Sequence, residues 1–261
     1  MPEAFSLSAT RSGRLDSVVA ALRDIPVGVI PYAANGALNI IGKRAREDIR
    51  AEMPRVFDRP VPYTLNSIRV IESKRETLTV RIAVKDDAPN NGTRPEDYLL
   101  PSVFGGARGE KRFERNLRYA GILREGWRAV PGSGAKLDSY GNLARGEIQR
   151  ILTAVKASFD PYQNRTASPR SRRNAKKAQY FVGGLDRVSI SGGEQKVTRS
   201  TLAPGIYVRD GRGVKPVLIF IAKQPQYRAR LPFDQIVERR ADADFATEFA
   251  RLANAITSRR R

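Results

Sequence analysis

Residues 31–53 read PYAANGALNIIGKRAREDIRAEM, and this stretch decides the fold class. Apolar residues recur in it every three or four positions, at Ala34, Leu38, Ile41, Ala45, Ile49 and Met53. Charged residues fill many of the positions between them, so the pattern predicts a long helix with one buried and one charged face. Pro31 suits the first turn of this helix, and Pro54 is expected to end it. The apolar run at 18–25 is compatible with a shorter preceding helix.

Two segments after this helix alternate apolar and polar residues, as the strands of a half-buried sheet do. The first contains Ile68 and Val70, and the second covers residues 78–84. The polar residues 73–76 supply a turn between them. The sequence therefore predicts a hairpin, one face of which meets the long helix.

Three later segments are also expected to be strands, at residues 180–182, 206–209 and 217–222. The DGRG sequence at 210–213 begins the connection between the last two. The apolar run at 217–222 lacks alternation, which indicates a strand that is covered on both faces.

The C-terminal part is expected to be helical from about Asp234 or Asp242, with an apolar stripe at Phe245, Phe249, Leu252 and Ile256. Together these patterns predict an α+β fold. Its small, mostly antiparallel sheet would be flanked by the long N-terminal helix and the C-terminal helix. Residues 1–29 are interpreted as an N-terminal extension and residues 30–261 as a single domain, which carries a loop and helix insertion at 86–142 and a basic arm at 164–179.

The chain is strongly basic, with 47 Lys and Arg against 27 Asp and Glu among its 261 residues, a formal charge of +20 and a pI near 10.8. Such a charge favours an acidic partner, which can be nucleic acid, anionic lipid or an acidic protein face. The basic arm adds six cations without any acid: Arg165, Arg170, Arg172, Arg173, Lys176 and Lys177. These residues are candidates to contact DNA, in a nonspecific and salt-sensitive way, or an acidic protein.

The chain has neither cysteine nor histidine. Their absence excludes disulfides, Ser-His-Asp and Cys-His catalysis and most zinc sites. We therefore expect no catalytic residue, no metal and no cofactor. The longest apolar run, at 217–222, is far below the roughly 20 residues of a membrane span, so no membrane association is expected.

Two short motifs are candidates for chemical sites. GSGAK at 132–136 lacks the spacing of a phosphate-binding loop and is interpreted as a turn. Asp186 with Glu194 and Lys196 imitates the carboxylate and lysine pattern of a metal-dependent nuclease. The glycines before Glu194 indicate a turn there, and isolated matches of this kind are frequent by chance.

Residues 98–142 read YLLPSVFGGARGEKRFERNLRYAGILREGWRAVPGSGAKLDSYGN and combine many glycines with large apolar residues. This composition indicates an ordered loop that packs against something. Within it, residues 111–119 are expected to form a short helix that buries Phe113 and Leu117 and exposes Lys111, Arg112, Arg115 and Arg118. A further helix is expected from near Asn142 to about Ser158.

The order of several segments resembles that of a protein family. These are FDRPVPYTLNSIRV at 57–70, VKDD at 84–87, YLLPSVFGGARGEKRFERNLRYAGIL at 98–123, VPGSGAKLDSYGN at 130–142, TLAPGIYVRDG at 201–211 and PVLIFIA at 216–222. The family comprises tailed-bacteriophage virion proteins related to minor tail protein Z and to tail-completion or neck proteins. The likeness covers residues 30–256.

The resemblance implies a structural role at the head-tail junction. The chain would be made in the cytoplasm of a bacterial host and would end in the virion, as a homo-oligomeric ring that is a hexamer or a dodecamer. Its partners would be other neck and tail proteins, such as a tail terminator or a head-closure or connector protein. Within that ring, the candidate subunit-interface residues are Phe104, Arg108, Phe113, Trp127 and Tyr140. The alternative function is a nonspecific DNA-binding protein that acts on packaged DNA.

Overall fold

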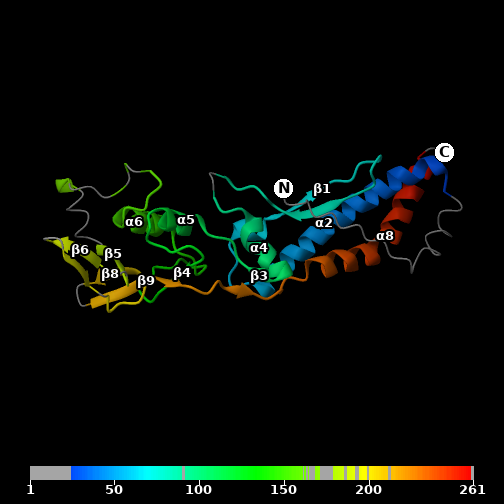
Figure 1. The fold of residues 1–261 in the computed structure, drawn as a ribbon. Coiled ribbons are helices and arrows are strands. Elements are labelled where there is room, and N and C mark those ends of the chain that lie inside the picture. The colour runs from blue at the N-terminus through cyan, green and yellow to red at the C-terminus, as the bar shows by residue number, and fades with distance from the viewer. Residues whose placement is uncertain are drawn as a thin grey trace. The chain divides into compact units, whose positions relative to one another are not determined.

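The structure is a computed structural model that describes residues 25–89, 92–160, 162, 164, 168–170, 179–184, 187–191, 194–198, 200–210 and 213–259. At 179, 187–191, 194–198 and 210, only the backbone is described. The chain divides into two compact units (Figure 1). Unit 1 comprises Met1–Gly106 and Arg228–Arg261, and unit 2 comprises Ala107–Tyr227.

Unit 1 is built on two long helices, α2 (Ile30–Val56) and α8 (Phe233–Ser258), which lie side by side (Figure 1). They run antiparallel, because Arg44 meets Glu248 while Asp48 meets Arg240. The short 3-10 helix η1 (Val27–Val29) precedes α2. One core cluster of small and aromatic residues lies between these helices: Val29, Ala33, Ala34, Ala37, Phe249 and Ala253.

A second core cluster of unit 1 joins α2 to a hairpin and to α4 (Pro95–Phe104). The hairpin strands β1 (Ile68–Ile71) and β2 (Arg81–Val84) are antiparallel and follow the short helix α3 (Pro62–Leu65). The buried members are Ile49, Met53, Ile68, Leu99, Leu231, Phe233 and Ile236. The hairpin predicted from alternation is thus confirmed, and it packs on the helix as expected.

Unit 2 contains a four-stranded antiparallel sheet in the order β4-β9-β8-β5. The strands are β4 (Arg128–Pro131), β5 (Gln179–Gly183), β8 (Gly205–Asp210) and β9 (Gly213–Ile221). Helices α5 (Arg112–Tyr119) and α6 (Arg145–Ala154) share a core with it. The buried residues are Phe113, Leu117, Leu123, Ala129, Ile151, Leu152, Ala157, Tyr180, Ile206, Val217, Leu218 and Phe220.

The described residues form two further pairs of strands. In unit 2, β6 (Arg187–Ser191) and β7 (Glu194–Thr198) form an antiparallel hairpin. The short strands β3 (Gly106–Ala107) and β10 (Gln226–Tyr227) also pair with each other.

The structure confirms the α+β fold class, with its long N-terminal and C-terminal helices and antiparallel strands. It differs from the expected single domain at 30–261, because the core of unit 2 and the two clusters of unit 1 are separate sets of residues. The expected extension at 1–29 also reaches too far. Val29 is fully buried in the core between α2 and α8, while residues 1–24 lie outside the described part.

The expected loop and helix insertion at 86–142 contains the predicted helix, as α5, and two elements that were not expected, α4 and β4. Of these, β4 is one of the two edge strands of the four-stranded sheet. At the end of α2, the helix continues through Pro54 to Val56 instead of ending before the proline. Proline fixes a φ angle that a helix accepts, so it disturbs the preceding turn more than its own position.

Candidate interaction surfaces

The structure separates the five residues that were predicted to contact a neighbouring subunit. Phe104, the last residue of α4, is 53 % exposed, and Tyr140 is 39 % exposed. Trp127 is half-buried and packs against the core of unit 2. Arg108 and Phe113 are buried inside unit 2, so the interface role expected for these two is corrected to a role in the fold.

Arg108 is buried because it forms an ion pair with Glu114 of α5. Its two terminal nitrogens donate hydrogen bonds to the two carboxylate oxygens of Glu114, at 2.8 and 2.6 Å. A third hydrogen bond runs from the guanidinium to the carbonyl oxygen of Gly109 at 3.0 Å. Such a two-pronged arrangement satisfies a buried guanidinium and fixes its orientation.

Glu114 also joins α5 to the sheet. Its carboxylate accepts hydrogen bonds from the backbone amides of Lys111, at 2.7 Å, and Ala129 of β4, at 2.9 Å. Burial works to raise the pKa of Glu114, but the hydrogen bonds from Arg108 and from the two amides outweigh it, and the pKa is lowered. The charged form is therefore the one that holds these elements together.

A second buried carboxylate, Glu147, performs the same task for α6. The hydroxyl of Tyr180 on β5 donates a short hydrogen bond to it, and Arg150 lies 3.4 Å away. Burial, followed by the hydrogen bond to Glu147, raises the pKa of Tyr180. Sequence patterns did not reveal the role of either buried carboxylate. Glu114 is the third residue of α5, a position from which glutamate often caps the first turn of a helix.

Tyr140 lies on a turn with a defined conformation. The carboxylate of Asp138 accepts hydrogen bonds from the backbone amides of Tyr140 and Asn142, both at 2.9 Å. Leu137 and Leu143 form an isolated antiparallel bridge at the base of this turn, and Gly141 has a φ of 77°. The exposed ring of Tyr140 is thus held on a short, hydrogen-bonded loop.

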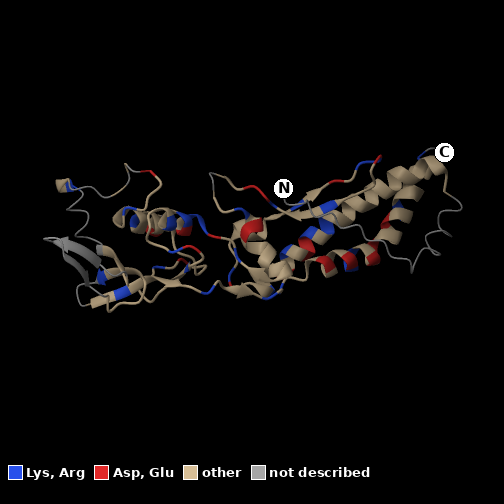
Figure 2. Cartoon of the chain, in the orientation of Figure 1, with Lys and Arg blue, Asp and Glu red and all other residues tan. Residues whose placement is uncertain are grey.

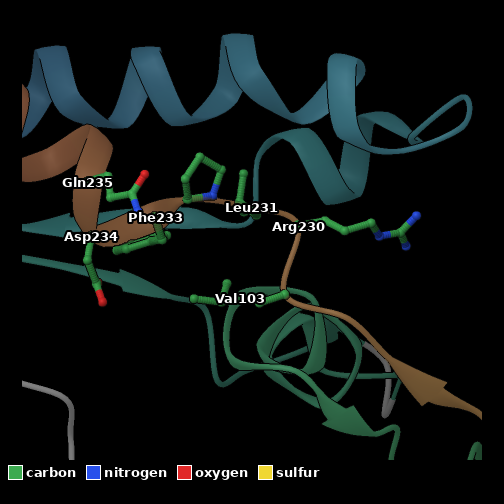
Figure 3. Close-up of a pocket in the computed structure, with 8 residues that line it drawn as sticks. Val103, Arg230, Leu231, Phe233, Asp234 and Gln235 are labelled. Atoms are coloured by element: carbon green, nitrogen blue, oxygen red, sulfur yellow. The ribbon is translucent and has the colours of Figure 1, made fainter.

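The α4 helix borders a small pocket in unit 1, lined by Val103 and residues 229–235 (Figure 3). Figure 3 shows the side chain of Arg230 extending away from Leu231 and Phe233. The pocket measures about 230 Å³, below the roughly 300 Å³ at which small-molecule sites begin. Burial, followed by the charge of Glu238, raises the pKa of Asp234, which is the one acidic residue among those lining it. We see no convergent set of polar groups for chemistry here.

The excess of Lys and Arg over Asp and Glu is larger in unit 2 than in unit 1. Figure 2 shows acidic and basic residues interspersed along α2 and α8 of unit 1. Unit 2 holds 24 of the 47 Lys and Arg but 9 of the 27 Asp and Glu. In unit 1 the arginines of α2 and α8 are largely neutralised: Arg44 meets Asp244 and Glu248, and Arg240 meets Asp48 and Asp244. In unit 2, two of the nine acidic side chains, Glu114 and Glu147, are buried in the core.

The basic arm lies mostly outside the described residues. This applies to Arg165, Arg172, Arg173, Lys176 and Lys177, while Arg170 is described and exposed. The nuclease-like pattern is also only partly visible, because Asp186 is outside the described residues. Glu194 and Lys196 lie on β7, where the backbone alone is described.

GSGAK at 132–136 is a turn that continues the pairing of β4 with β9. The backbone amides of Gly132 and Gly134 donate to the carbonyl oxygens of Val217 and Pro216, at 2.9 and 2.8 Å. A Cβ atom on Gly132 would lie 2.4 Å from the carbonyl oxygen of Pro216, so glycine is needed for this close approach. Since these two amides are already used, they cannot form a phosphate cradle.

Within the described ranges, no group of three or more acidic side chains is placed to hold a metal ion. No described helix is both long and apolar enough to cross a membrane. No protein-family model, curated protein or solved structure matches the chain.

Proposed function

We propose that this chain is a structural protein of a tailed-bacteriophage virion, located at the head-tail junction as a tail-completion, neck or minor tail protein. Its copies form a closed ring of six or twelve subunits that joins the tail to the head connector. The order of sequence segments from residue 57 to residue 222 supports the family assignment. The antiparallel pair of α2 and α8 with the β1–β2 hairpin agrees with the helix-flanked sheet that this resemblance implies.

One structural observation supports an assembly role most directly: α4 exposes two large apolar side chains on one face. Leu100 and Phe104 are 38 % and 53 % exposed, and residues four positions apart lie on the same side of a helix. The same helix is anchored in unit 1 by Leu99, which is 2 % exposed. An exposed apolar pair on an anchored element offers a preformed contact for another protein.

A ring requires this contact to be heterologous, so that a patch on one subunit meets a different patch on the next. We assign α4 to one side of the contact, with Phe104 as its anchor. Tyr140, on its hydrogen-bonded turn, is the second exposed aromatic residue among those predicted to contact a neighbouring subunit. Trp127 contributes less, because much of its ring already packs in unit 2.

Native mass spectrometry of the full chain tests this assignment. We expect a closed oligomer whose mass is six or twelve times that of the 29.0 kDa chain. The variant Leu100→Ser/Phe104→Ser should shift the oligomer to monomers, because truncating a hot-spot side chain at the centre of an interface costs about 2 kcal/mol or more. A matched control, Val214→Ser/Phe159→Ser, changes residues of unit 2 that are 44 % and 80 % exposed and should remain oligomeric. Equal loss in both variants would contradict the role of α4.

Nonspecific binding to packaged DNA is the second candidate function. It is favoured by a specific observation, the excess of basic residues in unit 2. A virion subunit at the junction can have both properties, since DNA passes through a ring at that place.

A further inference from the structure

Helix α5 in unit 2 divides sharply into a buried and a basic face. Phe113, Glu114 and Leu117 are buried. The other side carries Lys111 just before the helix and three arginines on it, and Arg124 is exposed shortly after it. We name this set the α5 surface: Lys111, Arg112, Arg115, Arg118, Tyr119 and Arg124.

The α5 surface carries five cations: Lys111, Arg112, Arg115, Arg118 and Arg124. Glu110 lies 3.0 Å from Arg118 and 3.9 Å from Arg115, so these two arginines share one acid. Glu114 is the acid within the helix, but it is 0 % exposed and is bound to Arg108 in the core. Like charges at helical spacing repel one another, so the surface gains free energy from a multiply charged anion that covers it.

Aromatic rings accompany the cations. Tyr119 is 70 % exposed, and the guanidinium of Arg118 lies over its ring, 4.7 Å from the centroid. Arg124 lies over the ring of Trp127 in the same way, at 5.4 Å. Exposed aromatic rings beside arginines are the elements with which proteins stack the bases of single-stranded nucleic acid while binding its backbone.

We propose that the α5 surface is a nucleic-acid-binding site that holds the phosphate backbone nonspecifically and stacks a base on Tyr119. The helix of eight residues is about 12 Å long, which matches roughly three phosphates along one strand. This site is distinct from the basic arm at 164–179. The proposal does not depend on ring formation.

A charge-matched pair of variants tests the site. Arg112→Gln/Arg115→Gln/Arg124→Gln removes three cations from the α5 surface. Arg46→Gln/Arg50→Gln/Arg55→Gln removes three exposed cations from α2 in unit 1, so the net charge changes equally. Affinity for a 20-nucleotide single-stranded DNA is measured by fluorescence anisotropy over a series of salt concentrations, with circular dichroism as the check on folding.

We expect the α5 variant to bind about tenfold or more weakly at low salt, and the control to bind within about twofold of the original chain. A plot of the logarithm of the association constant against the logarithm of the salt concentration has a negative slope. In the α5 variant the magnitude of this slope should be smaller by about 2, because each lost contact to a single strand removes roughly 0.7. Trp127 is the only tryptophan, so its emission should change when DNA binds beside Arg124. Tyr119→Ala, which leaves the charge unchanged, should weaken binding about fivefold or more.

Two results would overturn the proposal. If both triple variants lose affinity equally, binding follows net charge and the α5 surface is not a site. If polyglutamate competes as well as DNA and Tyr119→Ala has no effect, the surface recognises an acidic protein. Both results leave the oligomer measured by native mass spectrometry unchanged, so failure of this proposal is distinguishable from failure of the proposed function.

Discussion

Arg108 and Glu114 form a two-pronged ion pair inside unit 2, with hydrogen bonds of 2.8 and 2.6 Å and exposures of 8 % and 0 %. The pair links the segment before α5 to the helix, and Glu114 extends the link to β4. The sequence predicts that Arg108 lies at a subunit interface. Its observed position makes it a residue on which the fold of unit 2 depends.

Removal of one partner of this pair should therefore be costly. Glu114→Ala leaves a buried guanidinium without its carboxylate, and we expect the free energy of unfolding to fall by about 3 to 5 kcal/mol. The double variant Arg108→Met/Glu114→Leu should lose less than either single variant, because it leaves no uncompensated charge. Urea denaturation, monitored through Trp127 emission, measures the free energies of unfolding of the single and double variants. A change below 1 kcal/mol for Glu114→Ala would show that the pair does not support the fold.

The lowered pKa of Glu114 predicts the response of unit 2 to acid. A carboxyl group whose pKa is lower in the folded state stabilises the fold at pH values above its unfolded pKa, about 4.3 for Glu. This stabilisation is lost as the pH falls through the folded pKa. We expect the unfolding free energy of the original chain to fall more steeply below pH 4 than that of Glu114→Gln. Parallel pH profiles for the two proteins would contradict this.

Tyr180 predicts the opposite response, at alkaline pH. Its pKa is raised in the folded state, so the neutral hydroxyl stabilises the fold below the unfolded pKa of about 10, and this is lost as the pH rises further. Thermal unfolding between pH 8 and pH 11 should show a fall in melting temperature that is smaller in Tyr180→Phe. Tyr162→Phe is the control, because Tyr162 is 96 % exposed. If the two variants behave alike, the hydrogen bond to Glu147 is not responsible.

Two glycines of α2 should respond differently to alanine. A Cβ atom on Gly36 would meet the flexible end of Leu252 at 2.8 Å, whereas one on Gly42 would meet the stiff side chains of Val80, at 2.7 Å, and Val70, at 3.0 Å. Gly36→Ala should thus keep most of the roughly 0.5 to 1 kcal/mol that alanine gains over glycine in a helix. Gly42→Ala should lose about 1 to 3 kcal/mol through overpacking against the hairpin. Thermal denaturation ranks the two, and a reversed order would show that the hairpin adapts to the added methyl group.

Regular local patterns predicted much of the fold. In α2, the apolar stripe marked Ile41, Ala45, Ile49 and Met53, and all four are buried. Helix α5 buries Phe113, as its periodicity indicated. These predictions succeed because residues three or four positions apart lie on the same face of a helix, so the buried face can be recognised from a short stretch of sequence.

The features that sequence patterns missed depend on contacts between distant residues or on mixed local signals. Strand β4 is four residues long and is defined by its pairing with β9, about ninety residues later. Helix α4 begins with Pro95 followed by acids, a pattern that is typical of the first turn of a helix. Pro101 within the same helix instead favours a loop, so the local signals conflict. The position of Glu114 in the first turn of α5 is a local signal for a helix cap. The burial of Arg108 could not be predicted, because no local pattern reveals that this carboxylate also meets Arg108.

Electron cryomicroscopy of the virion tests the central claim most directly. The proposed function predicts that particles contain this chain as a ring of six or twelve copies at the head-proximal end of the tail. In that ring, Phe104 of one subunit would contact the next. Purified, infectious particles that lack the chain, or that carry it anywhere other than the head-tail junction, would contradict the proposal.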